Sequence, residues 1–226
     1  MDYHERCKKL WIVLLFAWTK QALVDNHHFH KRTKPFLEMA TFKSPQLELD
    51  RLANLDTYTI IDTLPEQQYD DITQLAAQIC GMPISLISFI DQDRQWFKSR
   101  HGFPHLQTDR QLSFCTHAIQ QPDKMMIVSD ATQDVRFSEN PLVYQEPKVV
   151  FYAGMPLVTE EGWALGTLCV IDNKPNQLTS AQAKSLTILA RQVITLLSLR
   201  KKTESWSERR KMNGGSIACV RTWSIL

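Results

Sequence analysis

The sequence contains no motif typical of a phosphate-binding loop, a metal site or a catalytic triad. No phosphate loop, paired carboxylates or convincing nucleophile–base arrangement can be placed by spacing in its 226 residues. These arrangements position the groups that acid–base, nucleophilic and phosphoryl-transfer enzymes require. We therefore expect no catalysis by the chain on its own and no metal site.

Cysteine is scarce, and its five copies follow no pairing pattern. The number is odd and no CxxC pair occurs among Cys7, Cys80, Cys115, Cys169 and Cys219. Disulfide frameworks and zinc sites use even numbers of cysteines or closely spaced pairs. Cys80, Cys115 and Cys169 lie in apolar segments. The pattern indicates reduced thiols in the core of a cytoplasmic protein.

A long hydrophobic run is also missing. The apolar run Leu10–Trp18 has nine residues, whereas a helix needs about 20 to cross a bilayer. No small-residue cleavage site of a signal peptide follows this run. We therefore expect no association with a membrane.

Excess positive charge is confined to the two ends of the chain. Residues 47–199 carry 11 Lys and Arg against 18 Asp and Glu, whereas residues 1–46 carry 8 against 4 and residues 200–226 carry 7 against 2. Binding to nucleic acid requires clustered positive charge. The acidic middle therefore argues against nucleic acid as a partner, and the basic ends are interpreted as solvated tails.

The periodic part of the sequence predicts one domain over residues 47–200. Residues 1–46 are predicted to be an extension outside the domain. Because MATFKSPQLELDRL, which begins at Met39, runs directly into the domain, residues 1–38 are interpreted as an over-extended start. Residues 201–226 are predicted to be a basic tail and are interpreted as truncated.

Helix signals occur at both ends of this domain. Leu47–Tyr58 has apolar residues near helical spacing. Thr63–Glu66 has the pattern of a capping box, which predicts a helix that Gly81 ends. Ser113 is predicted to cap a short helix over 114–121. Thr179–Gln182 is a second capping box, which begins the final helix.

Strand signals lie between these helices. Segments 84–90 and 95–100 predict a hairpin, and 125–128 predicts a third strand. Phe151–Asp172 reads as two apolar strands joined by a turn at Glu160–Gly162. The segments 101–109 and 130–148 are predicted to be loops, and the length of the second indicates function. This order predicts an α+β fold, one mainly antiparallel sheet with helices on its faces.

Six segments, in this order, resemble the GAF family of sensory domains, in the form found at the N-terminus of bacterial sensor histidine kinases and diguanylate cyclases. They are IDTLPE (61–66), ISLIS (84–88), RQWFKS (94–99), SFCTHAI (113–119), FYAG (151–154) and GTLCVID (166–172). The resemblance implies about six strands, terminal helices on one sheet face and a small-molecule pocket layer on the other. It also implies terminal helices that pair between subunits and pass a signal to an output protein. After Arg200 the sequence has no room for such an output domain, so we expect a regulatory protein without one.

Alternative functions come from other branches of the same family. One branch reduces free methionine sulfoxide with cysteines around the pocket, but the cysteines here are placed differently. Another branch attaches a bilin to a cysteine before the fifth strand, and Asn140–Phe151 contains none. We expect no covalent bilin. The ligand is a small molecule whose identity stays open, cyclic nucleotides included, and an N-terminal fragment of a kinase or cyclase is a further alternative.

Candidate pocket residues follow from chemistry and position. Cys115 and His117 are two apart on a helix and so face different ways, which makes a catalytic pair unsuitable. Cys115 is interpreted chiefly as a small buried residue and Cys169 as a packing residue. His117 is either a ligand donor or a satisfied helix histidine. Trp96 and Lys98 share one strand face, opposite Phe97, and either line the pocket or leave Trp96 at its rim. The predicted pocket residues are Trp96, Lys98, Phe114, Cys115, His117, Phe137, Phe151 and Tyr152.

Two further sets of residues carry structural predictions. Asp130, Asp134 and Arg136 are predicted to form an Asp–Arg clasp that fixes the long loop, in preference to a metal site. The final helix has more apolar surface than one sheet-facing stripe needs. Its 3-4-3 spacing of Leu186, Leu189, Val193 and Leu196 predicts a helix–helix seam in a homodimer.

Overall fold

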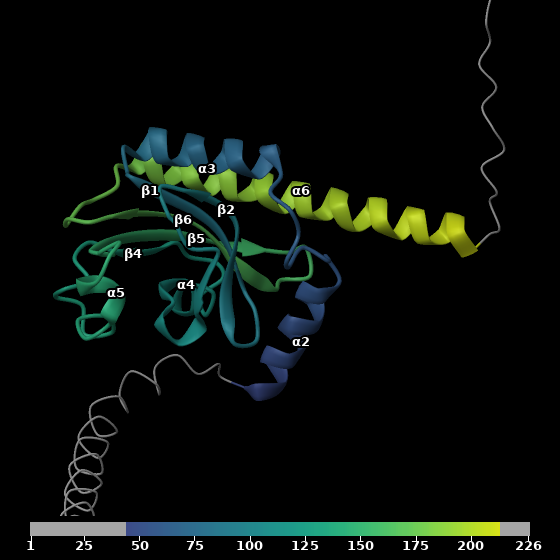
Figure 1. Ribbon diagram of the computed structural model, residues 1–226, viewed down its shortest axis with the longest axis horizontal. Coiled ribbons are helices and arrows are strands. Elements are labelled where there is room, and N and C mark those ends of the chain that lie inside the picture. The colour runs from purple at the N-terminus through teal and green to yellow at the C-terminus, as the bar shows by residue number, and fades with distance from the viewer. Residues whose placement is uncertain (1–43, 213–226) are drawn as a thin grey trace, which may run out of the picture. The chain divides into compact units, whose positions relative to one another are not determined.

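The computed structural model describes residues 44–212, which contain a six-stranded antiparallel sheet in the order β3-β2-β1-β6-β5-β4 (Figure 1). The interpretations of residues 1–38 and of the end of the tail lie outside the described residues. The strands are β1 (Ile84–Ile90), β2 (Arg94–His101), β3 (Gln107–Asp109), β4 (Met126–Val128), β5 (Phe151–Val158) and β6 (Ala164–Asp172). The predicted α+β fold is confirmed.

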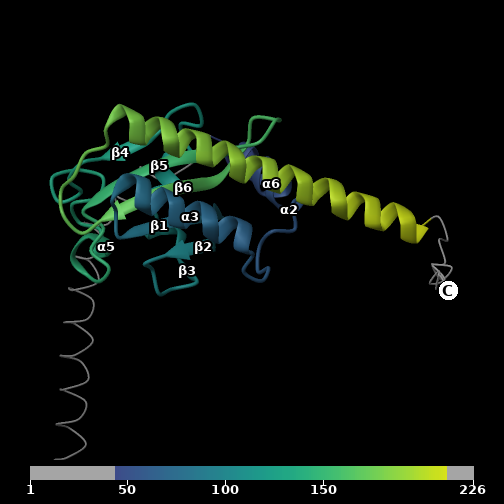
Figure 2. The same cartoon turned by 90° about the horizontal axis from the view of Figure 1, so that it is seen from above.

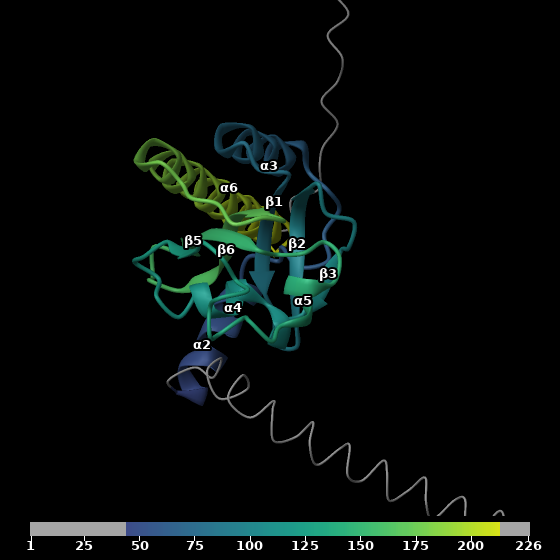
Figure 3. The same cartoon turned by 90° about the vertical axis from the view of Figure 1, so that its left-hand side faces the viewer.

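Helices cover both faces of this sheet. They are α2 (Pro45–Asp56), α3 (Gln67–Cys80), α4 (Phe114–Ala118), α5 (Pro141–Tyr144) and α6 (Ser180–Met212), with a 3-10 turn η1 (Arg110–Leu112). The pair α3 and α6 lies on one face, here called the helix face, and α4 and α5 lie on the other, here called the pocket face (Figure 3). The predicted two-layer arrangement around the sheet is therefore confirmed.

The central strands are apolar because both of their faces are covered. Every residue of β1 and of β6 is buried. In such strands alternate residues enter different cores. Ile87 and Phe89 of β1 join the helix-face core, and Leu86 and Ile90 join the pocket-face core. A nearly continuous apolar run thus serves two cores.

The helix α6 packs against its own domain along one stripe. Leu186, Ala190, Val193 and Leu197 are almost fully buried in the helix-face core. The predicted seam is therefore wrong at Leu186 and Val193, because their side chains are covered by the sheet and by α3. Leu189 and Leu196 flank the stripe and are half-buried. The helix has 33 residues, about 50 Å at 1.5 Å per residue, and its second half runs beyond the sheet (Figure 2).

Most predicted helix ends are confirmed. Gly81 follows α3 in the left-handed conformation, with φ 64°. The Gln182 amide donates to Thr179 Oγ1 at 3.2 Å, and the Thr179 amide donates to Gln182 Oε1 at 2.9 Å, as a capping box requires. Ser113 caps α4 by accepting from the Thr116 amide.

Three boundaries differ from the predictions. Thr63 does not cap α3, since its hydroxyl donates to the Ile60 carbonyl in a turn and the helix begins at Gln67. The predicted loop 101–109 contains the edge strand β3, which pairs Gln107–Asp109 with β2. The helix α6 runs past Arg200 to Met212, where a basic tail was predicted.

Lys98 ties β2 to the chain before α3. Its side chain is fully buried. The ammonium donates to Thr63 Oγ1 at 2.8 Å and to the Leu64 carbonyl at 2.7 Å, and it pairs with Glu66 at 2.6 Å. Each proton of the ammonium therefore has an acceptor, which a buried charge requires.

Among the described residues, no helix combines the length and apolarity needed to cross a membrane.

We predict that Lys98→Met destabilises the protein by about 2 kcal/mol, because the acceptors at Thr63, Leu64 and Glu66 lose a charged donor. The matched control is Arg94→Met, which removes a more exposed guanidinium from Asp62 and Asp91. Exposed pairs contribute less than about 1 kcal/mol. Urea denaturation of both variants measures the difference. Equal losses would show that Lys98 is no stronger a tie than a surface ion pair.

A second prediction concerns Gly166, which pairs with Phe89 across the β1–β6 contact. A Cβ at this position would lie 1.8 Å from the Ser88 carbonyl oxygen, so the two central strands would have to separate. Gly166→Ala should therefore cost at least about 3 kcal/mol in denaturation. Gly162→Ala is the control, because a Cβ at Gly162 would contact no other atom and only the positive φ disfavours alanine there. We expect this variant to lose about 1 kcal/mol of stability. Similar costs at both positions would contradict the close approach.

Candidate functional site

A row of polar side chains crosses the pocket face of the sheet. Gln95 lies on β2, Ser88 on β1, Thr167 on β6 and Tyr152 on β5, and all four are at most 5% exposed. Ser88 and Thr167 are cross-strand partners whose hydroxyls are 3.2 Å apart. Buried polar groups are costly unless they are hydrogen-bonded. Gln95, Thr167 and Tyr152 also share one further partner.

Cys115 is that partner. Ser113 caps α4, which carries Cys115. The Cys115 side chain is 1% exposed and lies against the pocket face of the sheet. Gln95 Nε2 donates to its sulfur at 3.0 Å, Thr167 Oγ1 at 3.0 Å and the Tyr152 hydroxyl at 3.3 Å. Residues from three strands thus converge on one sulfur, and the interpretation of Cys115 as a merely apolar residue is wrong.

Gly154 makes room for this arrangement. It follows Tyr152 by two residues on β5, so both lie on the same face of the sheet. A Cβ at Gly154 would lie 2.1 Å from the Tyr152 hydroxyl oxygen. The absence of a side chain at Gly154 therefore lets the Tyr152 ring lie along the sheet and reach Cys115.

The surroundings of Cys115 stabilise its thiolate. Burial alone would raise the pKa of this thiol, but hydrogen bonds from Cys169, Ser88, Thr167 and Tyr152 outweigh it and lower the pKa to about 6. The hydrogen bond to Cys115, together with burial, raises the pKa of Cys169 well above its usual value. Burial and the nearby sulfurs likewise raise the pKa of Tyr152. The hydrogen bonds therefore favour the thiolate of Cys115, whereas Cys169 and Tyr152 stay protonated.

The cavity beside this sulfur is small. Its volume is about 30 Å³, and its walls include Gln95, Phe97, Phe103, Phe114, Cys115 and Tyr152. Aromatic rings fill the space around it, with Phe114 stacked on Phe137 at 3.9 Å and Phe97 edge-on to Phe103 at 5.2 Å between centroids. Sites for drug-sized molecules occupy about 300–1,000 Å³. A nucleotide or a bilin would require the aromatic wall to move.

The structure divides the predicted pocket residues between the two faces of the sheet. Phe114, Cys115 and Tyr152 line the cavity, and Phe137 packs behind Phe114. Trp96, Lys98 and Phe151 lie on the helix face, so their assignment to the pocket is wrong. Alternation of β2 was predicted correctly, but the choice of face was reversed, because Phe97 enters the pocket-face core. The alternative placement of Trp96 at a rim is also wrong, since its side chain is in the core.

His117 lies on α4 with Cys115, and the residues that line the cavity do not include it. It is buried edge-on against Phe137, with 4.9 Å between centroids. Burial, with Arg136 nearby, lowers the pKa of His117 to about 4. Its imidazole is therefore neutral at physiological pH.

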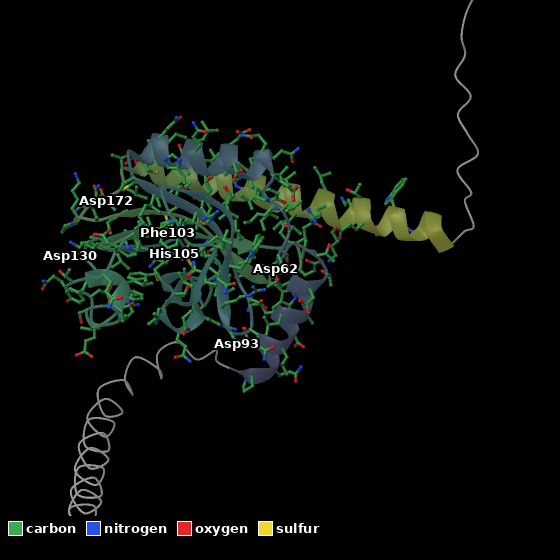
Figure 4. The ribbon with its side chains drawn as sticks, viewed as in Figure 1. Asp62, Asp93, Phe103, His105, Asp130 and Asp172 are labelled. Carbon is green, nitrogen blue, oxygen red and sulfur yellow. The ribbon has the colours of Figure 1, made fainter. Side chains whose placement is uncertain are left out.

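Part of the predicted loop clasp is present. Arg136 donates from Nε to Asp134 Oδ1 at 2.9 Å and from Nη2 to Asp134 Oδ2 at 2.7 Å, a two-point ion pair. Asp130 takes no part in this pair, because its carboxylate accepts from the amide and hydroxyl of Thr132 in its own turn. In the view of Figure 4, Asp130 lies near α5, whereas Phe103 and His105 lie near the centre of the domain. No cluster of three or more potential metal ligands occurs in residues 44–212.

Three residues of the site, Ser88, Gln95 and Thr167, were missed in the sequence. Each is a polar residue in a strand whose other residues are mostly apolar or typical of an edge strand. The signal was the placement of Ser88 and Thr167 inside ISLISFI and ALGTLCVID, where a hydroxyl must find a partner. That both would meet a cysteine on a separate helix depends on tertiary structure.

Comparisons with known proteins agree with this architecture. The family model described as GAF domain matches residues 64–197. A Pseudomonas aeruginosa protein named as a cyclic di-GMP phosphodiesterase is 42% identical over 137 residues, which are 61% of this chain and 23% of that protein. The chain thus spans about a quarter of the length of this curated relative.

Solved structures share the fold at low sequence identity. The GAF domain of an Acinetobacter phosphoenolpyruvate-protein phosphotransferase superposes with a TM-score of 0.50 at 16% identity, covering 77% of this chain and 100% of that one. The chromophore-binding domain of a bacteriophytochrome from R. palustris gives 0.50 at 10% identity, covering 71% of this chain and 64% of that one. Together with the family model, which matches more than half of the sequence, these results show that the chain belongs to the GAF domain family.

Proposed function

We propose that this GAF domain is a regulatory module of bacterial signal transduction, which responds to a small molecule at the pocket face and acts through α6 on an output protein. The observation that carries the proposal is the position of β6 between the two layers. Thr167 and Cys169 of β6 face the pocket, and Leu168 and Val170 face the core under α6. A structural change at Thr167 or Cys169 is therefore separated from α6 only by the strand β6 itself.

The relative with 42% identity suggests what the output acts on. That protein is named as a cyclic di-GMP phosphodiesterase, and the matched part is 23% of its length. The match has about the length of one GAF domain. We infer that the shared part is regulatory and that the output of this chain acts on cyclic di-GMP turnover in the cytoplasm, either in a separate protein or in a longer polypeptide.

A methionine sulfoxide reductase is the second candidate, because Cys115 has the stabilised thiolate that such chemistry needs. The cavity argues against it. Free methionine sulfoxide is an amino acid with a long side chain, and a space of about 30 Å³ holds no molecule of that size. Regulation by a smaller molecule is the better fit.

The partner of α6 is proposed to be a second copy of this chain. Ile188, Leu199 and Trp206 are exposed on α6 at 45%, 55% and 63%. Spacings of eleven and seven residues place them within about 20° of one line. This line lies away from the buried stripe and continues along the part of the helix that leaves the domain. Because these three side chains are apolar and exposed, they replace Leu186 and Val193 as the proposed seam of a parallel homodimer.

We predict that Ile188→Glu with Leu199→Glu converts the dimer to a folded monomer, because four carboxylates would meet in the seam. Sedimentation velocity measures the mass, and circular dichroism checks the fold. Val135→Glu is the matched control, since Val135 is exposed on a loop outside α6, and it should leave the dimer intact. A dimer that persists in the double variant would place the interface elsewhere.

The output is tested by cyclic di-GMP measured in bacteria that express the chain. The purified domain should hydrolyse no cyclic di-GMP. Expression of the natural sequence should change the cellular level by at least about twofold, whereas the Ile188→Glu, Leu199→Glu variant should not. Val135→Glu should behave as the natural sequence does. Hydrolysis by the purified chain would contradict a purely regulatory role, and an unchanged cellular level would contradict an output in cyclic di-GMP turnover.

A further inference from the structure

We propose that Cys115 and Cys169 form a redox-active dithiol that is oxidised by a small hydroperoxide, with hydrogen peroxide the smallest member of that class. As the stimulus of the domain, this reaction rests on the regulatory function proposed above. The chemistry itself rests only on the cluster and its cavity.

The first argument is the proximity of two buried thiols. Cys115 on α4 and Cys169 on β6 lie in the same core and are at most 1% exposed. Thr167, which donates to the Cys115 sulfur at 3.0 Å, precedes Cys169 by two residues on the same face of β6. An oxidised cysteine needs a second thiol within reach to close a disulfide. Here the second thiol lies in the same core on a different element, so a disulfide would covalently join α4 to the central strand β6.

The second argument is the set of donors around Cys115. Gln95, Thr167 and Tyr152 each donate to its sulfur. A neutral thiol at a packing position gains little from so many donors, whereas a thiolate is stabilised by all of them. The thiolate is the form that attacks a peroxide bond. The surroundings thus hold Cys115 in its reactive state.

The third argument is the size of the cavity. One water-sized probe needs about 10–15 Å³ of such volume, so the cavity of about 30 Å³ holds about two small atoms. Hydrogen peroxide has two oxygen atoms. The lining residues Thr108 and Leu142 are partly exposed, and they provide the side from which a small molecule enters. The Cys115 sulfur itself lines the cavity.

The reaction balances in two steps. The Cys115 thiolate attacks one peroxide oxygen, the O–O bond breaks, and the leaving alkoxide or hydroxide takes a proton, which leaves Cys115 sulfenic acid and an alcohol or water. The Cys169 sulfur then attacks the Cys115 sulfur, the S–O bond breaks, and water leaves with the Cys169 proton. The hydroperoxide is reduced by two electrons, and the dithiol is oxidised to a disulfide.

Cys80 provides an internal comparison. It is also buried, but it lies at the end of α3 in the helix-face core. Burial raises the pKa of its thiol to about 11. Burial alone therefore gives an unreactive thiol. Cys115 differs from Cys80 because hydrogen-bond donors and a second thiol lie near it.

The test is oxidation of the reduced full chain with stoichiometric hydrogen peroxide, followed by alkylation under denaturing conditions and peptide mass spectrometry. We expect a Cys115–Cys169 disulfide, and dithiothreitol should reverse it. Peptide-resolved detection reads Cys7 and Cys219 separately. The rate should already be near its plateau at pH 7, whereas an ordinary thiol reacts faster as the pH rises through about 8.5.

Variants separate the two steps. Cys115→Ser should abolish the disulfide, with no adduct at Cys169. Cys169→Ser should leave a sulfenic acid at Cys115 that dimedone traps. Cys80→Ser is the matched control and should react at the natural rate. Cumene hydroperoxide should react at least about tenfold more slowly than hydrogen peroxide, because the aromatic wall excludes its ring.

Two outcomes contradict the proposal. One is oxidation of Cys80 as fast as that of Cys115, and the other is equal rates with both peroxides. Sedimentation and cellular cyclic di-GMP, measured before and after oxidation, test the regulatory role separately. A disulfide that changes neither would support the dithiol chemistry and contradict its use as the stimulus.

Discussion

The burial of β1 and β6 on both faces is the constraint on which the rest of the structure depends. A polar side chain that is buried in a strand covered on two sides is costly unless it is hydrogen-bonded. On the helix face the packing is apolar, and α3 and α6 cover it. On the pocket face the hydroxyls of Ser88 and Thr167 meet each other across these two strands, and Thr167 also donates to the sulfur that α4 supplies. The cap at Ser113, which fixes where α4 begins, is therefore part of the site as much as Cys115 is.

The same constraint explains what could be predicted from the sequence. Helix ends such as Gly81 and Thr179 depend on local chemistry, and the fold class followed from the order of elements. The sequence did not show which face of β2 the helices cover. Alternation places Trp96 and Phe97 on opposite faces but does not say which of these faces packs against α3 and α6. Lys98 was assigned to a ligand for the same reason, although its ammonium is held by the chain that precedes α3. On α6 the stripe of Leu186 and Val193 and a second apolar line overlap in sequence, and only packing tells them apart.

Hydrogen-bond donors at Cys115 also set the energetic cost of changing it. Each buried donor left without an acceptor costs about 1–3 kcal/mol. Gln95, Thr167 and Tyr152 share one acceptor, so any reaction at this sulfur would change the hydrogen bonds of three strands at once. A cysteine that only fills space would lack this property.

Transmission to α6, in the mechanism proposed above, depends on close packing. Protein interiors have little free volume, so a displaced residue moves its neighbours. Leu168 and Val170 of β6 lie in the same core as the buried α6 residues Leu186, Val193 and Leu197. In that mechanism a displacement at the sulfur would reach, through β6, a helix whose far end is free of the sheet, and the length of α6 would enlarge the motion where a partner binds.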